Sequence, residues 1–437
     1  MDVTYIEVTF CNFVIAMRVL LVNTAERTGG AAIAANRLLH ALNHNGVEAQ
    51  MLVRDRKADA PEVVNIAPSW RLKADFLWER GVIWLANGLS RHNLFQVDIA
   101  NAGTDISKMD VFQKADVIHL HWINQGFLSL SDLEKILSSG KPVVMTMHDQ
   151  WYFTGICHYS GDCDKYRSQC EKCPMLKNGG IGMDLAKWVF TRKQAIYADK
   201  NITFVGCSKW MADLARNSKL TQGHPVTNIP NAIDTNIFSP VNQAEARKAH
   251  SLPADKRLLL FGAQRITDER KGFRYLAEAC DHIMKYHPDL AKELEVVVLG
   301  GDAQSVASAL PLPVHVVNYL SNEADIALLY SAVDLFVTPS LQDNLPNTIV
   351  EAMSCGTPCV GFDVGGIPEM IDHQENGYVA EYCDSGDFAE GIIWTLDQMR
   401  HTALREQARK KAVAIYEETA VAQRYLDVYR MTLKEKV

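Results

Sequence analysis

The segment VTPSLQDNLPNTIVEAMSCGTPCVGFDVGGIPEMI, residues 337–371, contains the pattern that decides the fold. It begins at the end of an apolar run, passes through a polar loop into the amphipathic stretch NTIVEAMSCG, and then enters a second apolar run, TPCVGF. An apolar run, a helical stretch and another apolar run in that order predict a βαβ unit. Such units place their strands parallel in one sheet, with the helix packed against a face.

The same alternation runs through the rest of the chain and predicts two α/β domains in series. Expected strands of the first series are RVLLVN (18–23), VEAQMLV (47–53), ADVIHLHW (115–122), PVVMTMH (142–148) and ITFVGCS (202–208). Those of the second are RLLLFGAQ (257–264), LEVVVLGGD (294–302), VHVVNYL (314–320), DLFVTPS (334–340) and TPCVGF (357–362). The predicted fold class is therefore α/β, with two Rossmann-like doubly wound domains facing each other across a cleft.

The domain boundaries are predicted from the breaks in this pattern. Residues 17–225 form the N-terminal domain, and 226–414 form the C-terminal domain, which opens with the Pro-, Asn- and Asp-containing connection VTNIPNAIDTNIFSP. Residues 415–437 are expected to form a helix that packs back on the N-terminal domain. Residues 1–16 lack the basic start of a signal peptide and are interpreted as an extension of the folded domain.

Composition excludes several classes of protein. The 437 residues are 48% hydrophobic and 22% charged, as in ordinary globular proteins. A net charge of −8 argues against a nucleic-acid protein, which needs a basic face to neutralise phosphates. The sequence contains no uninterrupted apolar run of the roughly 18 residues expected of a membrane span. Cytoplasmic residence is the resulting expectation.

Candidate site residues follow the predicted strands, because doubly wound domains bind ligands at the carboxyl ends of their strands. In the opening segment Asp343 follows a strand, and Glu351 lies eight residues later in the next helix. One carboxylate can accept hydrogen bonds from a hexose and the other from a ribose, while N–H groups at the start of the helix suit a phosphate. Asn344, Asn347 and Thr348 lie between them and are predicted to bind the same ligand.

Two further pairs of residues also follow strands. Gly29 and Gly30 separate the first strand from its helix, where glycine lets the backbone approach a phosphate closely. Arg265 and Lys271 follow the first strand of the second domain, where two cations can neutralise a departing diphosphate. Taken alone, a tight Gly-Gly turn and a solvated charged loop are the simpler interpretations.

Residues 17–430 resemble a family 4 retaining glycosyltransferase of the GT-B fold. The resemblance rests on the link IPNAIDTNIF, the Arg265/Lys271 pair, and PSLQDNLPNTIVEAMSCGTPCVG followed by GGIPEMI. It implies that Arg265 and Lys271 hold the donor diphosphate, that Glu351 binds the ribose and that Asp343 contacts the transferred hexose. The C-terminal domain would then hold the donor, and the N-terminal domain would lie on the acceptor side.

Within that family His148, at the end of a central N-terminal strand, would line the reaction centre. The sequence departs from the family pattern at three positions. Asp343 stands where glutamate is usual, Ala232 replaces a linker glycine, and Gln264 stands where glycine is common, which leaves Arg270 as a rival phosphate ligand. None of these changes removes a charge, so we interpret them as altered sugar preference.

Four cysteines lie close together in a segment with few apolar residues, and we refer to them as the cysteine cluster: Cys157, Cys163, Cys170 and Cys173. A C-x2-C pair with two nearby cysteines suits tetrahedral thiolate coordination of zinc. Four sulfur ligands leave no position for a substrate, so such a zinc would be structural. Reduced thiols in a flexible loop, or two disulfides, are the alternatives. The stretch HDQWYFTGICHYSGDC, followed by CEKCP, resembles a subgroup of bacterial capsule, exopolysaccharide and lipopolysaccharide transferases.

A second metal hypothesis concerns His119, His121 and His148, which lie at or near strand ends. Polar residues are commonplace there, so a histidine metal triad is the weaker interpretation. The Asp-Cys-Asp triplet at 162–164 resembles the metal motif of the other glycosyltransferase fold, but it lies inside the cysteine cluster rather than after a strand. No metal is therefore expected to take part in catalysis.

The resemblance implies transfer of a hexosyl group from a nucleotide diphosphate sugar to a glycan or lipid-linked glycan, with retained configuration, in bacterial surface polysaccharide biosynthesis. No cofactor is implied for catalysis. The alternatives are a nucleotide-sugar-binding protein without transferase activity and a synthase that glycosylates a small soluble phosphate. Residues 69–93 also suit a peripheral helix at the inner face of a membrane, although a core-packed helix is the simpler interpretation. They contain Trp70, Arg71, Lys73, Trp78, Arg80, Trp84 and Arg91.

Overall fold

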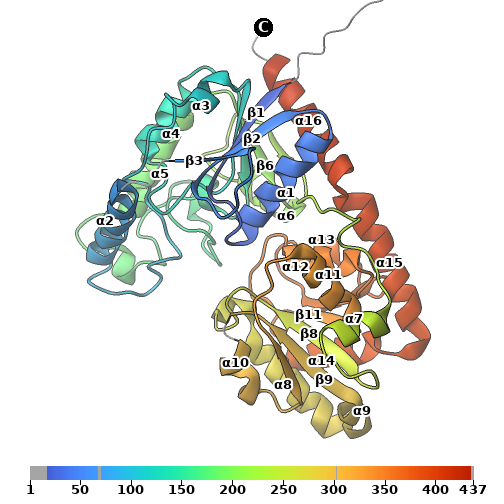
Figure 1. The fold of residues 1–437 in the computed structure, drawn as a ribbon. Coiled ribbons are helices and arrows are strands. Elements are labelled where there is room, and N and C mark those ends of the chain that lie inside the picture. The colour runs from blue at the N-terminus through green and yellow to red at the C-terminus, as the bar shows by residue number, and fades with distance from the viewer. Residues whose placement is uncertain (1–16, 67–69, 302, 435–437) are drawn as a thin grey trace, which may run out of the picture.

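The structure is a computed structural model and describes residues 17–66, 70–301 and 303–434. The predicted extension, residues 1–16, lies outside the described residues. The described chain forms two α/β domains, which lie one above the other in Figure 1.

The first domain is built on a seven-stranded parallel sheet with the order β3-β2-β1-β4-β5-β6-β7. Its strands are β1 (Arg18–Ala25), β2 (Glu48–Asp55), β3 (Val63–Asn65), β4 (Val117–Leu120), β5 (Val143–Met147), β6 (Ile202–Gly206) and β7 (Val226–Asn228). Its helices are α1 (Gly30–His44), α2 (Trp70–Ala86), α3 (Asp110–Lys114), α4 (Leu130–Leu137), α5 (Leu185–Tyr197) and α6 (Lys209–Arg216). The central strands are buried along their whole length, as expected for a parallel sheet covered on both faces.

The second domain repeats the arrangement on a six-stranded parallel sheet with the order β10-β9-β8-β11-β12-β13. Its strands are β8 (Arg257–Gly262), β9 (Leu294–Leu299), β10 (Val314–Val317), β11 (Leu335–Thr338), β12 (Cys359–Phe362) and β13 (Gly377–Ala380). Its helices are α7 (Gln243–Ala249), α8 (Phe273–Tyr286), α9 (Pro288–Glu293), α10 (Ala303–Val306), α11 (Glu323–Ala332), α12 (Asn347–Ser354), α13 (Ile367–Met370) and α14 (Ser385–Thr395).

These strand orders confirm the predicted fold class. In each sheet the chain winds outward from a central strand and then returns to continue on its other side, between β1 and β4 and between β8 and β11. Doubly wound sheets bind ligands at such reversal points, beyond the carboxyl ends of the strands. The loops after these four strands therefore define where a ligand site is expected.

The last two helices connect the domains, and Figure 1 shows them along one side of the molecule. Helix α15 (Gln398–Tyr416) packs on the second domain, and α16 (Glu418–Lys434) packs against α1 of the first. Val421, Tyr425 and Tyr429 of α16 are buried with apolar residues of β1 and α1. Among the described residues no helix is long and apolar enough to cross a membrane.

Three strands differ from the sequence prediction. Strand β3, a three-residue strand at the edge of the first sheet beside β2, was not predicted. Strand β7 lies at the start of the stretch that we predicted as a connection, because three of its residues extend the first sheet beside β6. Strand β13, with the sequence GYVA, was not predicted. It is a four-residue edge strand that begins with glycine, and such a short segment has too little periodicity to be distinguished from a loop.

Candidate functional site

Two helix N-termini, one from each domain, meet at the expected position. Gly29 and Gly30 begin α1 directly after β1, and the side-chain amide of Asn347 at the start of α12 donates to the Gly30 carbonyl at 3.0 Å. Asn231 in the interdomain connection donates to the Asn347 side-chain oxygen at 2.9 Å. Thr348 lies half-buried in the first turn of α12. Helix N-termini carry unpaired N–H groups and partial positive charge, so this meeting point suits an anion.

A partly buried ion pair lies beside this meeting point. Lys271 ends a 3-10 turn (Glu269–Lys271) after β8, and its ammonium is 2.7 Å from a carboxylate oxygen of Asp343, which follows β11. Burial acts to raise the pKa of Asp343, but the charges of Lys271 and Arg270 outweigh that effect and lower it. Gly272 holds the turn in place, since it adopts φ +69 and a Cβ there would lie 1.7 Å from the Pro339 carbonyl oxygen.

The cation beside this pair is Arg270 rather than Arg265. The Arg270 guanidinium donates to the Gln342 carbonyl at 3.1 Å and lies over the ring of Tyr159 at 5.2 Å from its centroid. Tyr159 belongs to the segment that contains the cysteine cluster, so this contact joins that segment to the second domain. Arg265 is exposed, and its side chain forms no hydrogen bond or ion pair with any part of the chain that the structure describes.

The Gly365-Gly366 pair packs on the loop that carries Asp343. A Cβ at Gly365 would lie 1.8 Å from the Asp343 carbonyl oxygen, and one at Gly366 would lie 1.8 Å from that of Asn344. Any larger residue would displace this loop. The two glycines therefore position Asp343 and Asn344 by close packing.

His148 lies where β5 ends, but its ring is engaged within the first domain. Its Nε2 is 2.9 Å from Nδ1 of His121, and its Nδ1 is 3.4 Å from the sulfur of Cys207. Burial lowers its pKa to about 4, so the ring is neutral near pH 7. The backbone carbonyls of Met147 and His148 accept hydrogen bonds from Asn344, at 3.0 and 3.2 Å. Asn344 thus attaches the second domain to the end of β5.

Glu351 is buried in α12 and has partners from both domains. One carboxylate oxygen is 2.9 Å from Nη2 of Arg37 in α1, and the other accepts a hydrogen bond from Tyr330 at 3.1 Å. Sequence reasoning did not identify Arg37. A signal was present, however: Arg37 follows Gly30 by seven residues, two helical turns, and therefore shares its face of α1.

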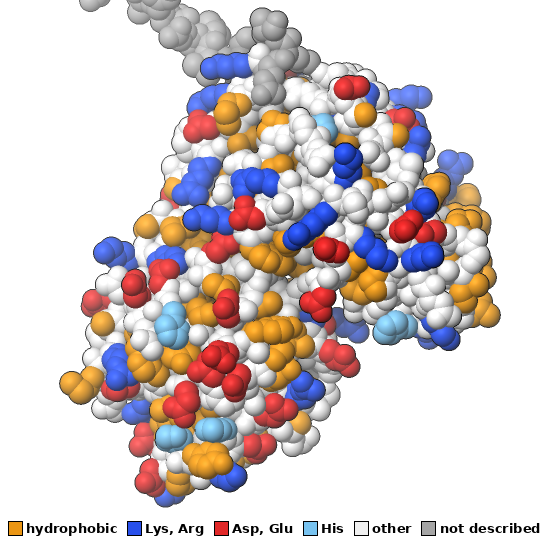
Figure 2. Space-filling model, turned by 180° about the vertical axis from the view of Figure 1, so that it is seen from behind, with side chains coloured by type: hydrophobic (Ala, Val, Ile, Leu, Met, Phe, Trp, Pro, Cys, Tyr) orange, Lys and Arg blue, Asp and Glu red, His pale blue; other side chains and the backbone are white. Residues whose placement is uncertain are grey.

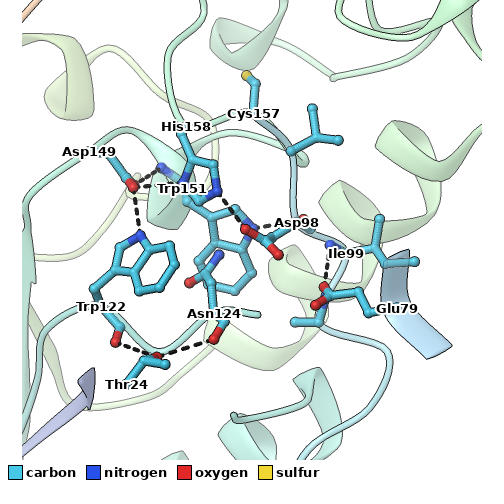
Figure 3. A network of polar contacts seen from close by, with 12 residues as sticks. Thr24, Glu79, Asp98, Ile99, Trp122, Asn124, Asp149, Trp151, Cys157 and His158 are labelled. Atoms are coloured by element: carbon cyan, nitrogen blue, oxygen red, sulfur yellow. Dashed lines mark hydrogen bonds and ion pairs between the residues drawn. The ribbon is translucent and has the colours of Figure 1, made fainter. Parts of the chain in front are cut away.

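The loop after β5 is held by a buried charged network (Figure 3). His158 lies between two carboxylates, with Nδ1 2.6 Å from Asp149 and Nε2 2.5 Å from Asp98. Burial disfavours the charged ring, but the two carboxylates outweigh it and raise the pKa of His158 to about 10. Asp149 also accepts from the indole of Trp122 at 2.9 Å, and Asp98 pairs with Arg80.

The cysteine cluster lies next to this network and lines one small cavity. Cys157, Cys170 and Cys173 are buried, and Cys163 is partly buried. Burial raises the pKa of Cys170 to about 12, and the Gly155 N–H donates to its sulfur at 3.3 Å. Across the described ranges, no group of three or more His, Cys, Asp or Glu residues is arranged to hold a metal ion. The arrangement therefore does not support zinc, which stays a prediction from the cysteine spacing.

The three histidines of the second metal hypothesis have partners within the first domain and on α16. His119 contacts Tyr429 of α16 at 2.8 Å and Thr146 at 2.7 Å, while His121 and His148 contact each other. The first histidine is thus part of the packing between α16 and the first sheet.

Two family models match this chain. The model described as Glycosyltransferase Family 4 matches residues 28–237, and the model described as Glycosyl transferases group 1 matches residues 255–398. The first model covers strands β2 to β7 of the first sheet and begins after β1, and the second covers all six strands of the second sheet.

Among curated proteins, the N-acetyl-alpha-D-glucosaminyl L-malate synthase of Bacillus anthracis is 24% identical over 216 residues, or 48% of this chain and 55% of that protein. The first relatives are matched over about half of their own length. The D-inositol 3-phosphate glycosyltransferase of Paenarthrobacter aurescens is 24% identical over 391 residues, covering 84% of each chain.

Solved structures show the same fold over nearly the whole chain. Sucrose-phosphate synthase from Thermosynechococcus elongatus aligns with a TM-score of 0.67 and 18% identity, covering 96% of this chain and 100% of that one. The Anabaena protein HepE, solved with UDP and glucose, aligns with a TM-score of 0.60 and 15% identity, covering 95% and 100%. WaaG, involved in lipopolysaccharide biosynthesis, aligns with a TM-score of 0.59 and 14% identity, covering 94% and 99%. The chain belongs to the family 4 glycosyltransferases and has their two-domain GT-B fold.

Proposed function

We propose that the protein is a retaining hexosyltransferase that moves a hexosyl group from a nucleotide diphosphate sugar to a hydroxyl of a glycan. The observation that carries the proposal is the partly buried Lys271–Asp343 pair, 2.7 Å apart, beside the facing N-termini of α1 and α12. A cation and two helix N-termini suit the diphosphate of a donor, and a carboxylate suits the hydroxyls of its sugar. Each of these groups lies at the carboxyl end of its sheet.

In this proposal each residue has a separate role in one displacement at the anomeric carbon of the donor sugar. The bond between the anomeric carbon and the phosphate oxygen breaks, a bond to the acceptor oxygen forms on the same face, and the acceptor proton passes to the departing phosphate. Lys271 and Arg270 stabilise the charge that develops on the diphosphate, with Arg265 at the exposed edge. Asp343 orients the hexose. Because both ring nitrogens of His148 are engaged, that residue orients the sugar through its ring face and its backbone.

A donor screen tests this proposal. Thermal shift measurements with UDP-, GDP- and ADP-sugars should give a rise in melting temperature for one of the three bases, since a ligand that binds only the folded state stabilises it. Product formation with that donor then separates a transferase from a nucleotide-sugar-binding protein. No stabilisation by any of these donors would overturn the proposal.

The acceptor class follows from two sets of similarities. The resemblance of the cysteine-containing segment to capsule and lipopolysaccharide transferases favours a glycan in surface polysaccharide biosynthesis. The relatives include D-inositol 3-phosphate glycosyltransferases, which favours a small soluble phosphate as the second candidate. Competition between a lipid-linked glycan and inositol phosphate in one assay distinguishes the two. We commit to the glycan.

An exposed apolar face on α2 supports contact with the inner face of a membrane. Figure 2 shows hydrophobic side chains gathered at the outer edge of the upper domain, where α2 lies. Ile181 extends this face, because its N–H donates to the Ala86 carbonyl at the end of α2 at 2.7 Å. Exposed apolar residues of the face are Trp70, Leu77, Trp78, Leu85, Leu89, Ile181, Met183 and Trp188. Aromatic and basic side chains together suit a lipid interface.

One part of the predicted membrane helix is wrong. Arg80 is buried and pairs with Asp98, so it does not face lipid headgroups, whereas Arg71 and Lys73 are exposed. Flotation with anionic liposomes tests the face: a Trp70→Ser/Trp78→Ser variant should lose the lipid-bound fraction. Met399→Ser, at an even more exposed position on α15, is the control. Wild-type protein that stays out of the lipid fraction would refute the membrane contact.

A further inference from the structure

Arg37 forms a buried ion-pair cluster that crosses between the two domains. It lies on α1 of the first domain, and its side chain is 9% exposed. Its Nη2 is 2.9 Å from Glu351 in α12 and 2.8 Å from Glu323 at the start of α11, while its Nε donates to Glu323 at 2.9 Å. Its guanidinium also lies over the ring of Phe238, 4.8 Å from the centroid. Four contacts thus hold one side chain of the first domain on the second.

The two glutamates of this cluster differ in their surroundings. The Glu323 side chain is 38% exposed and can be solvated by water, whereas the Glu351 side chain is 8% exposed. A buried carboxylate without a cation is costly, because it loses its hydration without compensation. Arg37 supplies that cation for Glu351, and no other Lys or Arg among the described residues forms an ion pair with it.

The carboxylate of Glu351 still has capacity for a ligand. It has about four lone-pair positions that can accept hydrogen bonds. Arg37 occupies one on the first oxygen, and Tyr330 occupies one on the second. Two positions remain, one on each oxygen. Two adjacent hydroxyl donors, such as those of a ribose, match that remaining pair.

We propose that Arg37 is a positioning residue that holds the Glu351 carboxylate for the ribose of the donor nucleotide, so that nucleotide affinity depends on a residue of the opposite domain. The inference rests on the proposed function. It assigns to α1 a role in nucleotide binding besides the contact of its N-terminus with a phosphate. It also means that separation of the domains weakens the ribose site, because the cation leaves with α1.

Two substitutions of Arg37 and one of Glu323 test the inference. Arg37→Met removes the charge and keeps much of the side-chain volume. Arg37→Lys keeps the charge but loses the planar fork that contacts both glutamates. Glu323→Gln is the matched control, since it disrupts the same interdomain cluster without removing the partner of Glu351. For each purified full-length variant, binding of UDP, GDP and ADP is measured by calorimetry and melting by circular dichroism.

The expected order of affinities is specific to a positioning role. Arg37→Met should weaken binding of the preferred nucleotide by about 10-fold or more, as for the loss of a hydrogen bond to a charged group. Arg37→Lys should lie between that variant and the wild type, and Glu323→Gln should change the dissociation constant by less than about 3-fold, because a partly exposed pair contributes little. In donor hydrolysis, Arg37→Met should raise KM with little change in kcat, the pattern of lost binding.

Three results would overturn the inference. One is an unchanged nucleotide affinity in Arg37→Met. Another is equal weakening in Arg37→Met and Glu323→Gln with a common fall in melting temperature, which would show a purely structural interdomain contact. The third applies if Arg37→Met does not fold. An unchanged nucleotide affinity in Arg37→Lys, together with a large loss of affinity in Glu323→Gln, would then overturn the inference. Failure of the wild type to bind any of the three nucleotides would instead refute the proposed function itself, so the two failures are distinguishable.

Discussion

Removal of the Lys271 ammonium should slow sugar transfer far more than it weakens donor binding. The group lies 2.7 Å from Asp343 and is about a quarter exposed, so its environment is close to the surface regime with an effective dielectric constant of about 20. At that dielectric constant, the lysine charge and a full unit of opposite charge about 4 Å away attract each other by about 4 kcal/mol. A departing diphosphate gains only part of a charge in the transition state. We therefore expect a loss of about 2.7 kcal/mol, or about 10²-fold in kcat/KM, at the lower end of losses for single oxyanion-stabilising donors.

The Lys271 variants are best assayed by donor hydrolysis, which needs no acceptor. Release of nucleoside diphosphate is followed for the wild type, for Lys271→Met and for Lys292→Met. Lys292 is a control at an exposed position, where its ion-pair partner among the described residues is its helical neighbour Asp289. The wild type and the control should agree within about 2-fold, since exposed pairs contribute little. Lys271→Met should be slower by the amount given above.

A double variant separates two roles of Lys271. If the ammonium serves only to neutralise Asp343, the double variant Lys271→Met/Asp343→Asn should be no slower than Asp343→Asn alone. If it stabilises the departing diphosphate, the double variant should be slower than Asp343→Asn alone. Near wild-type kcat/KM in Lys271→Met, or a double variant as fast as Asp343→Asn alone, would refute the reasoning. Circular dichroism confirms that the fold is intact in each case.

Three further outcomes are expected. Glu351→Gln should weaken binding of the free nucleotide and of the sugar donor alike, whereas Asp343→Asn should chiefly lower kcat; equal loss of nucleotide affinity in both would contradict this division. His158, with a folded pKa of about 10 against an ordinary value of 6.5, stabilises the fold fully below pH 6.5 and loses that effect as the pH rises toward 10. In denaturant unfolding, the destabilisation caused by His158→Gln should thus be largest near pH 6 and shrink toward pH 10, and a constant difference would contradict the charged ring. If the cysteine cluster binds zinc, as its spacing predicts, elemental analysis should find about one zinc per chain, and a metal-free protein with free thiols would end that hypothesis.

Much of the fold was predictable because the central strands of both sheets are mostly apolar on both faces. Runs such as VVMTM, and LLLF within RLLLFG, place apolar side chains on both faces and therefore indicate a buried parallel sheet. Short edge strands lack this constraint. Strand β13 has four residues and begins with Gly377, and only its pairing with β12 distinguishes it from a loop.

The candidate site was predictable where a residue follows a strand or begins a helix. Lys271, Asp343 and Asn347 are of that kind, and the structure places them near one another across the switch points of the two sheets. Arg265 and Arg270 could not be ranked from the sequence, because both lie in the same charged loop. The turn that ends at Gly272 decides between them, since it brings Arg270 beside Asp343 and leaves Arg265 exposed.

Two contacts at the start of its segment connect the cysteine cluster to the candidate site. His158 joins the segment to Asp149, which follows His148 in the chain, and Tyr159 lies under the guanidinium of Arg270 in the second domain. Neighbouring residues of a backbone point to different sides, so a shift of this segment changes both contacts together. A segment that is already ordered loses less conformational entropy when it forms these two contacts. We therefore expect disruption of the cysteine cluster to alter the packing of Tyr159 on Arg270 before it alters either sheet.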